Sequence, residues 1–138
     1  MSTKERVLIV DDQRELREFL LFILKDKFAV STACAAEEAF IYMAEHSVDL
    51  IVLDFMMPGM DGITALAEIK KNYSDTEVIM MTGFAPADTI RKAFSLGAFA
   101  FLTKPLDIDK LIDTIDEALR KRTSRKSGQI SDNKYFDR

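Results

Sequence analysis

The sequence has only one cysteine and no long apolar segment. Its single cysteine, Cys34, excludes an internal disulfide. The longest apolar run, Phe19–Leu24, falls far short of the roughly 20 residues that span a bilayer. No apolar signal-peptide region follows the N-terminus. These absences exclude disulfide scaffolds and membrane-spanning proteins, and we expect a cytoplasmic protein with no membrane partner.

The length and the charge distribution indicate one domain with a short tail. The chain has 138 residues, of which 48% are hydrophobic and 30% charged, an ordinary composition for a single globular domain. Residues 1–120 carry 13 basic and 21 acidic residues, whereas residues 121–138 carry 6 and 2. We therefore expect an acidic domain over 1–120 and a basic polar tail or linker remnant over 121–138. An acidic surface does not neutralise phosphates, so we expect no direct nucleic-acid binding.

Short apolar runs alternate with helical patterns along the chain. The expected strands are Val7–Val10, Phe28–Val30, Leu50–Leu53, Val78–Met81 and Ala98–Leu102. Apolar residues recur at helical spacing between them and over Ile108–Leu119. Continuous apolar strands indicate burial on both faces, which a parallel sheet covered by helices provides. The pattern predicts an α/β fold with a doubly wound, five-stranded parallel sheet of flavodoxin-like order 2-1-3-4-5.

Polar residues follow four of these strands at the point where each ends. They are Asp11 and Asp12 after the first strand, Asp54 after the third, Thr82 after the fourth and Lys104 after the fifth. In this fold ligands bind at the carboxyl ends of the strands, so we expect these side chains to converge. Three neighbouring carboxylates with no histidine or cysteine beside them favour Mg²⁺, with Mn²⁺ as an alternative. An aspartate in such a site can act as a nucleophile and form an aspartyl phosphate.

The combination of these strand-end residues, in this order, is specific for one family. Through it, residues 5–120 resemble the receiver domain of two-component response regulators. The resemblance is carried by Asp11-Asp12, the segment Asp54–Gly62, Thr82-Gly83 and Lys104-Pro105. It implies that Asp54 accepts a phosphoryl group from a phosphohistidine of a histidine kinase or histidine phosphotransfer protein. It also implies Mg²⁺ ligands from Asp12, Asp54 and the backbone carbonyl of Met56, with Asp11 holding a metal-bound water.

The resemblance assigns further roles to the ends of the fourth and fifth strands. Lys104 would pair with the phosphoryl group, Thr82 would reorient toward it, and the Lys104–Pro105 peptide would be cis. Phe101 stands at the position of an aromatic switch that turns inward on activation. The fourth helix, the fifth strand and the fifth helix would form the face for a downstream protein, an output domain or a homodimer. The chain would be a phosphorylation-controlled switch and not an enzyme, because it would catalyse only its own phosphorylation and dephosphorylation.

Three positions depart from the common family pattern. Phe101 lacks the hydroxyl of the tyrosine that is frequent at the switch position, so its signal would depend on packing. Met56 and Phe84 stand at positions that tune hydrolysis of the phosphoryl group, and neither offers a polar atom to orient a water. We therefore predict slow self-dephosphorylation.

Two other functions are compatible with a sheet of this kind. A phosphatase of the haloacid dehalogenase type uses an aspartate nucleophile, but in an Asp-x-Asp pattern after the first strand, whereas this chain has Asp11-Asp12-Gln13. A flavodoxin would have a Ser/Thr/Gly-rich loop at that point.

Capping of a helix by Asp12 with Glu15 is a structural alternative to metal binding. His46 and Cys34 are expected to be structural.

Overall fold

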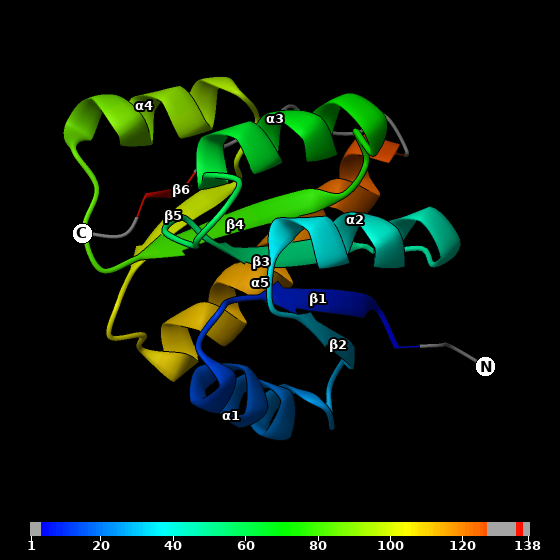
Figure 1. The fold of residues 1–138 in the computed structure, drawn as a ribbon. Coiled ribbons are helices and arrows are strands. Elements are labelled where there is room, and N and C mark those ends of the chain that lie inside the picture. Colours follow the sequence, from blue (N-terminus) through cyan, green and yellow to red (C-terminus); the bar gives the residue numbers. More distant parts are fainter. Residues whose placement is uncertain (1–3, 127–134, 137–138) are drawn as a thin grey trace.

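The computed structural model describes residues 4–126 and 135–136, which form a central sheet with helices on both of its faces (Figure 1). The strands are β1 (Arg6–Val10), β2 (Ala29–Ala33), β3 (Leu50–Asp54), β4 (Glu77–Thr82), β5 (Ala100–Thr103) and β6 (Tyr135–Phe136). The helices are α1 (Arg14–Leu24), α2 (Ala36–Glu45), α3 (Gly62–Asn72), α4 (Ala87–Ser95) and α5 (Ile108–Lys126).

The sheet has the predicted parallel topology and one additional strand. Its order is β2-β1-β3-β4-β5-β6, and all neighbouring strands pair in parallel. The first five strands therefore confirm the order 2-1-3-4-5. Tyr135 and Phe136 lie in the segment that we expected to be a polar tail or linker remnant, but their backbone pairs with that of Ala100 and Phe101. Two residues are too few for a periodic pattern, so the sequence held no signal for this strand.

The apolar runs of the strands divide between two cores because successive side chains of a strand point to opposite faces. Leu8 and Ile51 belong to the core beneath α2, α3 and α4. Ile9 and Val52 belong to the core beneath α1 and α5. The chain changes faces where the strand order reverses at β1. In folds of this kind ligands bind at the carboxyl ends of the strands beside the reversal, here β1 and β3.

Helix α5 is longer than its apolar stripe predicted. The stripe ends at Leu119, but the helix continues to Lys126, so the predicted domain boundary at residue 120 falls inside it. Polar contacts hold the added turns. Arg122 pairs with Asp49 at 3.1 Å, and Arg125 pairs with the buried Glu77.

None of the helices in the described residues is both long enough and apolar enough to cross a membrane.

Candidate functional site

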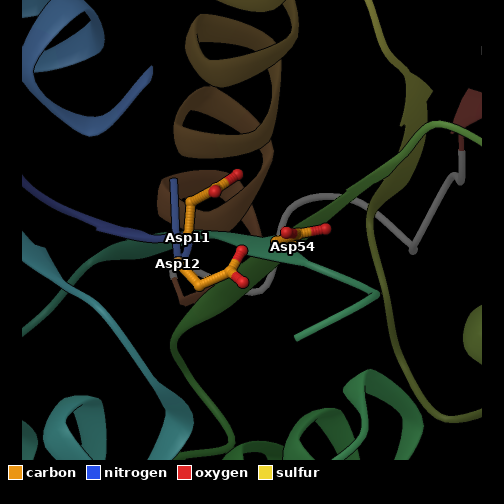
Figure 2. Close-up of side chains that lie close together, drawn as sticks. All are labelled: Asp11, Asp12 and Asp54. Atoms are coloured by element: carbon orange, nitrogen blue, oxygen red, sulfur yellow. The ribbon is translucent and has the colours of Figure 1, made fainter. Parts of the chain in front are cut away.

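Three aspartates meet at the carboxyl edge of the sheet. Asp11 and Asp12 follow β1, and Asp54 is the last residue of β3 (Figure 2). One carboxylate oxygen from each lies within 4.8 Å of the others. Asp11 and Asp54 are almost completely buried, with exposed fractions of 0% and 3%, whereas Asp12 is exposed. The parallel register of β1 and β3 brings together carboxylates that are more than 40 residues apart in the sequence.

Local hydrogen bonds orient the two buried carboxylates. Asp11 Oδ1 accepts the backbone N–H of Gln13 at 2.7 Å, and Asp54 Oδ1 accepts that of Met56 at 3.1 Å. Both are bonds to the backbone two residues on, the pattern by which aspartate shapes a turn. Arg17 donates to the backbone carbonyl of Asp11 at 2.8 Å. In each carboxylate, Oδ1 thus accepts a hydrogen bond from the following loop, and Oδ2 accepts one from Lys104 in the shared site.

Lys104 supplies the cationic group of the site from the end of β5. Its Nζ donates to Asp11 Oδ2 at 2.8 Å, to Gln13 Oε1 at 3.1 Å and to Asp54 Oδ2 at 3.4 Å. Its backbone N–H donates to the carbonyl of Thr82, and the peptide to Pro105 is cis, the isomer that the resemblance implied. Gln13 was not among the predicted site residues, although its place directly after the acidic pair could have indicated it.

The charges of the site perturb the ionisation of its members. Burial raises the pKa of Asp54, and the charge of Asp11 adds to this effect, while the Met56 N–H and Lys104 act against it. Burial alone would lower the pKa of Lys104, but its hydrogen bond to Asp11 and the charges of Asp54 and Asp11 raise it overall. The ammonium therefore stays protonated at neutral pH, and the ionised form of Asp54 is held at a cost in free energy.

Thr82 is the last residue of β4, the strand next to β3, and Phe101 lies on β5. Thr82 is buried, and its hydroxyl donates to the carbonyl of Phe84 at 3.0 Å and accepts the Phe84 N–H at 3.2 Å. The hydroxyl is thus engaged with the loop between β4 and α4. Phe101 has an exposed fraction of 1%, and its ring lies 6.1 Å from that of Phe55. Its side chain therefore occupies the inward position.

The rim of the site is apolar. Met56 and Phe84 have exposed fractions of 62% and 72%, which is unusual for side chains of their size. Met56 also lines a shallow 390 Å³ pocket together with Phe55, Met57, Pro58 and Asp61. The two side chains thus offer any ligand or partner at Asp54 an apolar surface and no polar side-chain atom.

The loop after β3 is positioned by a close backbone contact. The N–H of Gly62 donates to the carbonyl of Phe55 at 3.1 Å, and a Cβ at Gly62 would lie 2.7 Å from Phe55 Cα. Asp61 caps α3 by accepting the N–H of Thr64 at 2.9 Å. Only glycine allows this approach, so Gly62 determines how the loop that carries Met56 leaves the site.

The residues with weaker signals are His46, which follows α2, and Cys34, which follows β2. His46 stacks on the ring of Tyr42, with 4.2 Å between centroids, and both His46 and Cys34 are exposed. Neither belongs to the group of three aspartates.

The donor set fits a small divalent cation. Carboxylate oxygens are hard ligands, and Mg²⁺ is typically held by one or two carboxylates while it keeps several waters. Asp12, Asp54 and the backbone carbonyl of Met56 could hold such an ion, and Asp11 could hold one of its waters. The group is typical of a metal site, and its excess negative charge over the single ammonium of Lys104 is what a cation would neutralise.

Comparisons with known proteins point to one family. Residues 7–116 match the family described as "Response regulator receiver domain". The chain is 37% identical over 116 residues to the chemotaxis protein CheY of Bacillus subtilis, covering 83% of this chain and 97% of that one. It is 35% identical over 128 residues to the regulatory protein AtoC of Escherichia coli, covering 91% of this chain but only 28% of AtoC. The solution structure of the beryllofluoride-activated NtrC4 receiver domain dimer superposes with a TM-score of 0.80 at 36% identity, covering 85% of this chain and 98% of that one.

Proposed function

The chain belongs to the response regulator receiver domain family of two-component signalling, and we propose that Asp54 is its phosphoacceptor. The observation that carries the proposal is the position of this carboxylate. It is buried at the end of β3, lies within 4.8 Å of Asp11 and Asp12, and has Lys104 Nζ 3.4 Å from its Oδ2.

The transfer would need little beyond positioning and neutralisation of charge. A carboxylate oxygen of Asp54 would bond to the phosphorus as the bond from phosphorus to the imidazole nitrogen of the donor breaks. Lys104 would pair with a phosphoryl oxygen, since its ammonium already lies between Asp11 and Asp54. A Mg²⁺ ion, or Mn²⁺, at Asp12, Asp54 and the Met56 carbonyl would add further positive charge for the phosphoryl oxygens.

Thr82 would couple phosphorylation to the conformation of the chain. A hydrogen bond from its hydroxyl to a charged phosphoryl oxygen is worth about 1.5–3 kcal/mol. To form it, the hydroxyl would leave the two hydrogen bonds with Phe84 that now hold the loop between β4 and α4. A gain of this size shifts a two-state equilibrium by roughly ten- to hundredfold. The loop would then carry the change to α4, while Phe101 on β5 would respond by packing.

The partners follow from the family, and their identities are part of the proposal. The donor would be a histidine kinase or a histidine phosphotransfer protein, and the face formed by α4, β5 and α5 would contact a downstream protein or output domain. A homodimer is a further arrangement, which we place at the same face, and the beryllofluoride-activated NtrC4 receiver domain is an example of a dimer. We propose a receiver over residues 1–120 that acts in the cytoplasm without binding nucleic acid directly. The chain spans 97% of CheY but only 28% of AtoC, so its relatives include proteins of about its own length and much longer ones.

Phosphorylation by a small-molecule phosphodonor tests the proposal directly. Asp54→Ala should abolish incorporation of phosphate in the presence of Mg²⁺, and EDTA should abolish it in the unchanged chain. Asp26→Ala is the matched control, because Asp26 is exposed and remote from the site, and it should be labelled normally. Unchanged labelling of Asp54→Ala would place the acceptor elsewhere.

The apolar rim is the basis of a second test. Met56 and Phe84 are exposed two residues after Asp54 and Thr82, respectively, and their side chains offer no group that could orient an attacking water. We propose that this slows loss of the phosphoryl group. The variants Met56→Asn and Phe84→Glu should lose it faster than the unchanged chain when decay of the phosphoprotein is followed over time. Equal or faster decay in the unchanged chain would refute the role of the rim.

A further inference from the structure

Without β6, the edges of the sheet would be β2 and β5. The two strands differ in how far their residues are buried. Three of the four residues of β5 are buried, whereas four of the five residues of β2 are exposed or partly exposed. Open edge strands present unpaired N–H and C=O groups that can pair with other chains, and proteins commonly cover or blunt such edges. An open β5 edge, with its apolar run Ala100-Phe101-Leu102, would therefore be more prone than β2 to pair with another chain.

The last turns of α5 bring the chain back to the end of the sheet where β5 begins. Arg122 contacts Asp49, which directly precedes β3, and Arg125 pairs with Glu77, the first residue of β4. Arg122 Nε also donates to the backbone carbonyl of Asp75 at 2.5 Å. These contacts place the end of α5 at the amino-terminal edge of the sheet, from which a further parallel strand has to start.

The chain after α5 is long enough to reach β5. Eight residues, 127–134, separate Lys126 from Tyr135, and eight extended residues span about 26 Å. Two strand spacings amount to only about 10 Å. The backbone of Tyr135 pairs in parallel with that of Ala100, and the backbone of Phe136 with that of Phe101. In Figure 1 the short red strand β6 lies along β5, so the unit β5-α5-β6 repeats the strand-helix-strand connection of the rest of the fold.

We infer that the C-terminal segment Tyr135–Phe136 is an intramolecular strand that covers the outer edge of β5 against pairing with another chain. The occupant of this edge is the chain's own segment, added by backbone hydrogen bonding as in other cases of strand addition. This inference concerns the sheet edge and stands whether or not Asp54 is a phosphoacceptor. If the proposed function also holds, a partner that binds across α4, β5 and α5 has to displace the segment or accommodate it next to Phe101.

Hydrogen exchange of the full chain tests the pairing. Tyr135→Pro removes a backbone N–H and disfavours pairing at this position, and a chain ending at Lys126 removes the strand altogether. Both should raise the exchange rate of amides in residues 100–103 by roughly tenfold, since few hydrogen bonds hold this edge. Asp26→Ala, at an exposed residue between α1 and β2, should leave these rates unchanged. Peptides from β1 and β3 report that the core is intact, and unchanged exchange of β5 in both tail variants would overturn the pairing.

Self-association tests the covering role separately. The chain ending at Lys126 exposes the β5 edge, so light scattering should show more association than for the full chain at the same concentration. A fusion of the truncated chain to an unrelated flexible segment of equal length controls for bulk and should associate as the truncated chain does. Equal association of the full and truncated chains would show that the segment does not protect this edge.

Discussion

Replacing Asp54 by asparagine tests the electrostatic account of the site most directly. The substitution removes one of the two buried carboxylate charges of the site and keeps an oxygen for the N–H of Met56. Lys104 keeps its hydrogen bonds to Asp11 and Gln13. We expect Asp54→Asn to be more stable than the unchanged chain at neutral pH in the absence of divalent ions, even though it removes the residue proposed as central to function.

The magnitude follows from three opposing effects. At an effective dielectric constant of 20, two like charges at the 4.8 Å limit between Asp11 and Asp54 repel by about 3.5 kcal/mol. The attraction between Lys104 Nζ and Asp54 Oδ2 at 3.4 Å is about 4.9 kcal/mol on the same scale. The attraction exceeds the repulsion by about 1.4 kcal/mol, and the raised pKa of Asp54 indicates that the cost of burying the carboxylate outweighs this difference. The expected gain is about 1–3 kcal/mol, the cost of burying a polar group that is incompletely compensated.

The gain depends on pH in a direction that the raised pKa determines. Below the ordinary aspartate value of 3.8, the carboxyl is protonated in both folded and unfolded chains and costs nothing. As the pH rises from there through the higher pKa of the folded state, the folded chain binds more protons than the unfolded chain and loses stability. The advantage of Asp54→Asn should therefore be complete above the folded pKa and should disappear as the pH falls through it.

Urea unfolding in EDTA at several pH values measures this difference. Asp26→Asn is the matched control, because Asp26 is exposed. Its free energy of unfolding should differ from that of the unchanged chain by less than about 0.5 kcal/mol. Mg²⁺ at a hundred times its dissociation constant should stabilise the unchanged chain by about 2.7 kcal/mol and Asp54→Asn by less. Equal or lower stability of Asp54→Asn at every pH would refute the argument that the buried charge is held at a cost.

Two further predictions concern the loop after β3, and both use urea unfolding and Mg²⁺ titration. Asp61→Ala removes the cap on the N–H of Thr64 and should cost about 1 kcal/mol without changing Mg²⁺ affinity, whereas Asp61→Asn should recover most of the stability. Gly62→Ala places a Cβ against the backbone of Phe55 and should cost about 1–3 kcal/mol. It should also weaken Mg²⁺ binding, because the loop that carries Met56 has to move, and unchanged affinity would contradict this coupling.

The convergence of the site could be predicted because it follows from strand topology alone. Parallel strands connected by right-handed crossovers place all their carboxyl ends on one edge, so Asp11, Asp54 and Lys104 had to meet once the strands were identified. Their contacts in the structure agree with this expectation. The sequence could not predict that Asp11 and Asp54 are buried whereas Asp12 is exposed, since burial depends on which loops lie over each carboxylate.

Side-chain orientation and the far end of the chain needed the tertiary structure. The inward position of Phe101 results from packing against Phe55, a residue 46 positions earlier. The engagement of Thr82 with Phe84 depends on the loop conformation after β4. The strand Tyr135–Phe136 forms because an unpaired edge lies within its reach.

The sequence by itself determined the order of the first five strands and the acidic, hydroxyl and ammonium groups at their carboxyl edge, because local apolar periodicity and chain connectivity are properties of the sequence. Only the tertiary structure decided which side chains are buried, which hydrogen bonds they make and which segment pairs with β5. These depend on contacts between residues far apart in the chain, whose free energies no local pattern records.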